Sequence, residues 1–107
     1  MRTIIPVTAL VFMCMPAWSG QSDVIAKARY VILRHHLISD RELKCSSLVY
    51  GVESTPRFAA VTVLERHGGG CPGDVDTSPR RFTLQMDTKT GRAQWDHGTT
   101  GEMRPIP

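Results

Sequence analysis

No apolar run in this sequence is long enough to cross a bilayer. The longest covers residues 4–15, which is 12 residues, whereas a membrane-spanning helix needs roughly 20. The run follows the positive charge of Arg2, and it precedes Pro16 and an Ala17-x-Ser19 pattern. A charge, a short apolar run and a small-residue cleavage site together make a secretory signal peptide, so we expect residues 1–19 to be removed. Residues 20–107 would then form a single small domain, periplasmic or secreted, without a membrane span.

Cysteine is scarce, with three residues in the chain. Cys14 lies in the apolar run and is lost with it, and the residues before it lack the small side chain of a lipid-anchor site. Cys45 and Cys71 are an even pair in an exported small domain, a setting that predicts a disulfide between them. Since position 71 lies 26 residues after position 45, the bridge would stabilise the fold by about 3 kcal/mol. Two unrelated buried thiols are the alternative.

The chain also lacks a strong charge of either sign. Without Arg2, 12 of the 13 basic residues remain against 10 acidic ones. The basic residues are scattered, and Arg80-Arg81 is their one adjacent pair. No basic stripe alternates with aromatic residues, so nothing in the sequence favours nucleic-acid binding. The Gly-x-Ser-x-Gly, Walker A and dinucleotide-binding motifs are absent from the sequence as well.

Residues that could carry catalysis or hold a metal are few. Cys71 with His67 is the one pairing that would place a nucleophile beside a base, and a disulfide at Cys71 removes its thiolate. His35 and His36 are adjacent on a predicted helix and point about 100° apart, unlike the i, i+4 pair of a metal site. We therefore expect no catalytic residues, no metal and no cofactor, which means a protein that is not an enzyme.

One helix is predicted over residues 24–38, after the N-cap residues Ser22 and Asp23. Its apolar positions form two opposite stripes. The first stripe holds Val24, Ile25, Ala28, Val31, Ile32, His35 and Ile38. The second stripe holds Ala26, Tyr30, Leu33 and Leu37. A helix that only covers a sheet needs one apolar stripe, so the second must meet either the rest of the chain or a partner.

Strands follow the helix. Residues 39–44 are polar and are expected to break the helix, and residues 98–107, rich in Gly and Pro, are expected to be irregular. Alternating patterns predict four strands, at residues 47–52, 57–66, 81–86 and 92–96. The second strand is apolar on both alternating sets, which is typical of a central strand covered at least partly on both faces. The expected fold class is α+β, with one N-terminal helix packed on a four-stranded antiparallel sheet and one disulfide.

A turn phrase joins the last two predicted strands. Met86 is followed by Asp87-Thr88-Lys89-Thr90-Gly91, a hairpin turn with Gly at the left-handed position. One helix, then antiparallel strands, with this turn before the closing strand, resembles the cystatin-like and PepSY-like small domains of exported bacterial proteins. The resemblance covers most of residues 20–107 in outline, and the two cysteines are not part of its pattern. It implies a binding or inhibitory module, since such domains are commonly non-catalytic.

The segment at residues 67–79 stands apart from this regular pattern. About a dozen residues without secondary structure form a long loop for so small a domain, and such loops tend to be functional. Asp74-x-Asp76 matches the first positions of a calcium loop, but the later ligands are missing. The candidate partner-binding residues are Gly68, Gly69, Gly70, Pro72, Gly73, Asp74 and Asp76. A tethered surface loop without a partner is the alternative.

Two functions are compatible with these features. The first is a small exported, non-enzymatic binding protein, an inhibitor or immunity-type protein that presents the disulfide-tethered loop to an exported hydrolase or toxin. The second is an accessory or structural subunit of a cell-envelope assembly, docked through the second helix stripe. Both require a protein partner.

Overall fold

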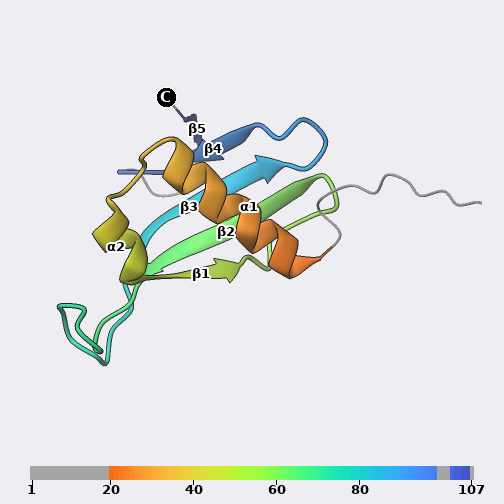
Figure 1. The fold of residues 1–107 in the computed structure, drawn as a ribbon. Helices are drawn as coiled ribbons and strands as arrows, with labels where there is room; N and C mark the ends of the chain where they lie inside the picture. The colour runs from red at the N-terminus through yellow and green to blue at the C-terminus, as the bar shows by residue number, and fades with distance from the viewer. Residues whose placement is uncertain (1–19, 99–101, 107) are drawn as a thin grey trace, which may run out of the picture.

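The computed structural model describes residues 20–98 and 102–106. The expected signal peptide, residues 1–19, lies outside these described residues. The elements are α1 (Gln21–Arg34), α2 (Asp40–Lys44), β1 (Ser46–Tyr50), β2 (Phe58–Glu65), β3 (Arg80–Asp87), β4 (Ala93–Trp95) and β5 (Arg104–Pro105). The strands form one antiparallel sheet in chain order, and α1 lies across one face of it (Figure 1). The predicted α+β class is confirmed.

The core lies between α1 and one face of the sheet. Val61 pairs with Leu84, and Val63 pairs with Phe82, so the inward side chains of β2 and β3 form a continuous apolar surface. The buried side chains that meet there are Val24, Ala28, Val31, Ile32, Ala59, Val61, Val63, Phe82, Leu84 and Met86. Burial of each large apolar side chain stabilises the fold by about 1.5–3 kcal/mol. This burial holds α1 on the sheet through its first stripe.

The far face of the sheet is covered only in part. Ala60 of β2 is buried beneath the turn before the strand, where the Ser54 hydroxyl accepts a hydrogen bond from the Ala60 N–H at 2.9 Å. Thr83 of β3 is buried beside Asp96, whose carboxylate accepts from the Thr83 N–H at 2.6 Å and from Arg80 at 2.7 Å. Phe58, at the start of β2, stays exposed. The far face is thus partly polar, and Phe58 and Val49 remain 40% and 45% exposed on it.

The sheet has five strands among the described residues, so the predicted count of four was wrong. The fifth, β5, lies in the tail that was expected to be irregular, and it pairs Pro105 with Gln94 and Arg104 with Trp95. Two residues are too few to show an alternating pattern, and a proline cannot donate to a ladder and is confined to edge strands and strand ends. Local sequence therefore carried no sign of β5, which forms because β4 offers it a free edge.

The first helix ends at Arg34, earlier than the predicted residue 38. His36 adopts a positive φ of 51°, while its N–H donates to the Leu33 carbonyl and the Leu37 N–H donates to the Ile32 carbonyl. These two bonds around a left-handed residue make a Schellman C-cap, which usually carries glycine. Because His36 stands where glycine is usual, no glycine marks the end of the helix in the sequence. The chain turns here, so Leu37 and Ile38 pack against the core.

A short helix follows where only a polar break was expected. The Ser39 hydroxyl accepts from the Glu42 N–H at 3.1 Å, and the Glu42 carboxylate accepts from the Ser39 N–H at 2.9 Å. This reciprocal pair is a capping box, and the Ser39-x-x-Glu42 spacing is its sequence signature. Leu43 is buried by the resulting turn of α2. The signature was present in the sequence, and α2 places Cys45 at its C-cap.

Candidate functional site

The loop between β2 and β3 is exposed along residues 72–79 and carries its own internal structure. In Figure 1 it extends beyond the ends of β2 and β3, at the end of the sheet nearest α2. Its base is fixed by the predicted disulfide, which is confirmed: Cys71 in the loop is bonded to Cys45, at the junction of α2 and β1. The loop is thus joined covalently to the folded body at one point within its length.

A tight turn precedes the bridged cysteine. The Gly68 N–H donates to the Cys71 carbonyl, the Cys71 N–H donates to the Gly68 carbonyl, and both bonds measure 3.0 Å. Gly69 and Gly70, between them, have φ angles of 59° and 94°. Positive φ at both central positions defines a type I′ turn, which strongly favours Gly. The glycine run is therefore required by the shape of this turn.

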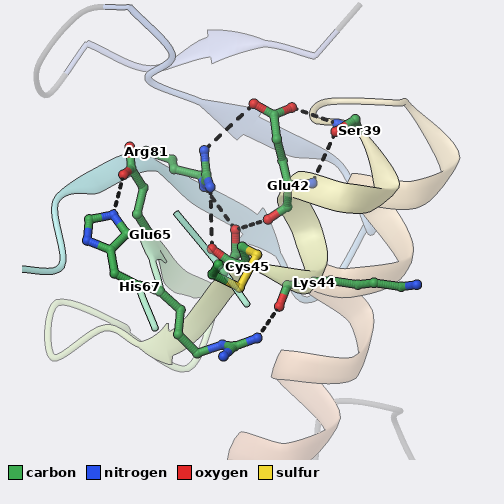
Figure 2. Close-up of a disulfide and its surroundings, with 10 residues drawn as sticks. Ser39, Glu42, Lys44, Cys45, Glu65, His67 and Arg81 are labelled. Atoms are coloured by element: carbon green, nitrogen blue, oxygen red, sulfur yellow. Dashed lines mark hydrogen bonds and ion pairs between the residues drawn. A yellow bond between two sulfur atoms is a disulfide. The ribbon is translucent and has the colours of Figure 1, made fainter. Parts of the chain in front are cut away.

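His67 joins the loop to the end of β2. Its Nε2 lies 2.8 Å from the Glu65 carboxylate and its Nδ1 lies 2.6 Å from the Asp74 carbonyl (Figure 2 shows the Glu65 contact). Both neighbours are acceptors, so the geometry fits an imidazolium that donates from both ring nitrogens. The Glu65 carboxylate first, and the Asp74 carbonyl second, raise the pKa of His67 above its ordinary value. This bridging role of His67 differs from the role of a base for Cys71, and no local pattern in the sequence indicates it.

Gly73 fits against the imidazole ring. A Cβ placed on Gly73 would lie 2.6 Å from two ring atoms of His67, and the φ of this glycine is 117°. Either the backbone angle or the close approach alone would favour glycine here. The ring, with 8% of its side chain exposed, is thereby covered by the loop that it binds.

The tip of the loop is a second turn, from Asp74 to Thr77. The Thr77 N–H donates to the Asp74 carbonyl at 3.0 Å, and the Asp74 carboxylate accepts from the Asp76 N–H at 2.9 Å. Asp74 and Asp76 were both predicted as contact residues, but their roles differ, because the Asp74 carboxylate holds the turn. The Asp76 carboxylate has no such bond within the described part of the chain. Val75, between them, is 69% exposed and is not among the residues that the sequence indicated for partner binding.

A polar cluster supports the base of the loop. Arg81 of β3 donates through Nε to the Ser46 hydroxyl at 2.9 Å and through Nη2 to the Cys45 carbonyl at 3.3 Å, beside the disulfide (Figure 2). Arg66 donates to the Lys44 carbonyl. These guanidinium groups satisfy carbonyls at the C-terminal end of α2, which a helix leaves without partners. A concavity of about 280 Å³ lies over the cluster, lined by Pro72 among others.

Groups weighed for other chemistry are arranged differently. The sulfur of Cys71 is bonded to Cys45, so Cys71 and His67 do not form a thiolate–imidazole pair. In the described residues no three His, Cys, Asp or Glu side chains gather in a way that could hold a metal ion. Within the same residues no helix is long and apolar enough to cross a membrane. The larger concavity, of about 810 Å³, lies between the end of α1 and the β3–β4 hairpin, where Asp87 is bound by Arg57 at 2.8 Å.

The second stripe of α1 is only partly what the periodicity predicted. Tyr30 and Leu33 lie on the outer surface of the helix, 57% and 45% exposed, and Ala26 is exposed beside them. Leu37 lies beyond the end of the helix and contacts the core instead. The stripe is therefore reduced to Ala26, Tyr30 and Leu33, and the Lys27 ammonium lies 5.8 Å from the centre of the Tyr30 ring.

Comparison with known proteins finds no family model, no curated protein and no solved structure that matches this chain. The resemblance to cystatin-like and PepSY-like domains stays a prediction. The features that bear on function are those of the chain itself: an α+β fold, one disulfide, and an exposed loop held from within.

Proposed function

We propose that this protein is a small exported binding protein without catalytic activity, an inhibitor or immunity-type protein that contacts an exported hydrolase or toxin through loop 67–79. One observation carries the proposal: the loop is fixed at several points, and yet its tip is exposed. The disulfide, the type I′ turn, the His67 bridge and the Asp74 turn all restrict the backbone. Together these restraints hold an exposed segment in one shape, which is what a contact surface requires.

Restraint of this kind favours binding. Association is opposed by the entropy lost when a flexible loop is ordered at an interface, and a loop already held in one shape loses less of it. Four glycines of the loop, Gly68, Gly69, Gly70 and Gly73, have positive φ angles. Glycine is the residue that loses most conformational freedom on folding. Ordering these four glycines therefore lowers the stability of the fold, and the shape of the loop is kept despite this cost.

Export is the second part of the proposal. A disulfide is consistent with an oxidising compartment such as the periplasm or the extracellular space. In such a compartment a small domain can inhibit a hydrolase or toxin by inserting a rigid loop into its cleft. Inhibition of this kind requires no catalytic group on the inhibitor. The sequence pattern at residues 1–19 supports the same location.

The test is capture of a partner by an affinity-tagged full-length chain produced in its native host and exported there. Gly69→Val and Gly70→Val force a β-branched residue into positive φ and should weaken capture at least tenfold while the fold remains. Gly91→Val is the matched control, since Gly91 has a φ of 81° in the β3–β4 hairpin, away from the loop. Equal capture by the loop variants and the Gly91→Val variant would refute the role of the loop.

One observation favours a second candidate, an accessory or structural subunit of a cell-envelope assembly. Tyr30 and Leu33 present an apolar outer surface on α1. If this surface is the contact, Tyr30→Ala with Leu33→Ala abolishes capture while Gly69→Val leaves it unchanged. The opposite pattern favours the inhibitor-type function, so the two sets of variants discriminate between the candidates.

A further inference from the structure

We infer that Val75 is the anchor residue of loop 67–79, and that it inserts into an aliphatic pocket in the cleft of a partner protein whose rim carries basic side chains. The inference rests on the proposed function and names the kind of partner surface that the loop fits. It assigns the central contact to a residue outside the glycine and aspartate set that the sequence indicated.

The first support is the position of Val75 in the tip turn. It occupies the first central position of the turn from Asp74 to Thr77, where the chain reverses direction. Turn positions favour Pro, Gly, Asn, Asp and Ser. A β-branched apolar residue contradicts this preference, and breaks of local preference are expected at functional sites. Its exposed fraction of 69% leaves it available for contact.

The second support is that the side chain is held in place. Its Cγ1 lies 3.1 Å from the point where a Cβ of Gly68 would be, so the absence of a side chain on Gly68 makes room for Val75. The His67 ring binds the Asp74 carbonyl just before Val75, and the Asp74 carboxylate accepts from the Asp76 N–H just after it, so the backbone is held on both sides of Val75. An exposed apolar side chain on a fixed backbone has the properties of a binding hot spot, which fills a pocket with little loss of freedom.

The third support is the charge of the loop. Loop 67–79 contains two of the ten acidic residues of the chain and no Lys or Arg. The other eight acidic residues are outnumbered by 12 basic ones in residues 20–107. The tip thus carries negative charge on a protein whose other charged residues are mostly basic, and the Asp76 carboxylate lies directly beside Val75. Complementary charge on the partner means Lys or Arg at the rim of the pocket, where it speeds association.

The experiment begins in the native host with the full chain. An aliphatic amino acid that carries a photoactivatable diazirine replaces Val75 in one variant and Val52 in the control. Val52 is the matched position because it is the same residue type, is fully exposed at 100%, and lies in the turn at the opposite end of β2. We expect one protein to be cross-linked from position 75 and not from position 52. The cross-linked peptide should contain aliphatic residues with Lys or Arg nearby.

The cross-linked protein is then purified and its affinity measured. Val75→Ala should weaken binding roughly tenfold, because two methyl groups are lost from the pocket. Val52→Ala should leave the dissociation constant unchanged. Asp76→Asn should slow association in low salt and have less effect in high salt. Unchanged unfolding midpoints for all three variants show that only the interface was altered.

The outcomes separate the inference from the proposed function. If Val75→Ala binds as wild type while Gly69→Val does not, the loop is the contact and Val75 is not its anchor. The same diazirine residue placed at position 30 or 33 completes the test, because a cross-link from there and none from position 75 would overturn both. Cross-linking from positions 75 and 52 alike would mean non-specific contact and would also overturn the assignment of Val75.

Discussion

Replacement of Gly73 by alanine should detach the loop from His67. A Cβ at this position would lie 2.6 Å from ring atoms, whereas ordinary van der Waals contact begins at 3.4 Å, so the ring must move by about 0.8 Å. The bond from Nε2 to Glu65 measures 2.8 Å. A shift of that size along the bond, away from Glu65, takes it to about 3.6 Å, a length at which a hydrogen bond no longer exists. Gly73→Ala should therefore break the bridge between β2 and the loop.

Gly70→Ala is the control for the backbone. Gly70 has a φ of 94° and Gly73 a φ of 117°, but a Cβ on Gly70 would meet nothing within 4 Å. A non-glycine residue in these regions costs about 1–3 kcal/mol. Both variants carry this backbone strain, and only Gly73→Ala also displaces the ring. Chemical denaturation should therefore show a larger loss of unfolding free energy for Gly73→Ala than for Gly70→Ala.

The pH dependence gives a second readout. In the wild type the pKa of His67 is raised by the Glu65 carboxylate and the Asp74 carbonyl, so the protonated ring stabilises the folded state. This stabilisation is fully present below about pH 6.5, the ordinary His pKa, and is lost as the pH rises through the raised pKa. In Gly73→Ala the pKa of His67 should fall towards its ordinary value. In Gly70→Ala it should stay raised.

NMR titration of the His67 ring measures this pKa directly, and the other three histidines serve as internal references. The reasoning would be refuted by a Gly73→Ala protein whose His67 titrates as in the wild type and whose stability equals that of Gly70→Ala. Such a result would mean that the ring does not hold the loop.

Two further predictions concern the body of the protein. Intact-mass measurement should show that the exported protein begins within a residue or two of Gly20 and weighs two hydrogens less than its reduced form. The double variant Cys45→Ala with Cys71→Ala should lower the unfolding free energy by about 3 kcal/mol, since the bridge spans 26 residues. An unprocessed chain or free thiols would contradict this. Val61→Asp places an unpaired charge at a fully buried position and should prevent folding, while Val52→Asp, at a fully exposed one, should change the unfolding free energy by less than about 0.5 kcal/mol in denaturant titration. A folded Val61→Asp protein would mean that β2 is not central.

Local sequence patterns alone were sufficient to predict the central strands, the turn before Gly91 and the disulfide. The apolar alternation around Val61 and Leu84 predicted β2 and β3, because side chains two residues apart share a face of a strand. The turn before Gly91 was predicted for a similar reason, since its φ of 81° favours glycine. Cys45 and Cys71, the two cysteines outside the predicted signal peptide, predicted their own pairing. In each case the determinant lies within a few residues or in a simple count.

Tertiary structure decided what depends on residues distant in the sequence or on competing local options. Periodicity showed two apolar stripes on α1, and only packing on the sheet selected the one that contains Ile32. The early end of the helix depends on His36 in a left-handed conformation, and Leu37 leaves the helix to pack against the core. The strand β5 exists because β4 has an edge to pair with.

The same division applies to the loop. Composition identified residues 67–79 as unusual, since Gly, Pro and Asp are turn-forming residues wherever they occur. It did not identify Val75, because an exposed valine and a buried one are the same letter in a sequence. The contact of His67 with the Asp74 carbonyl joins residues seven positions apart. Such a contact has no periodic signature, and it arises only once the disulfide and the turns have brought the two segments together.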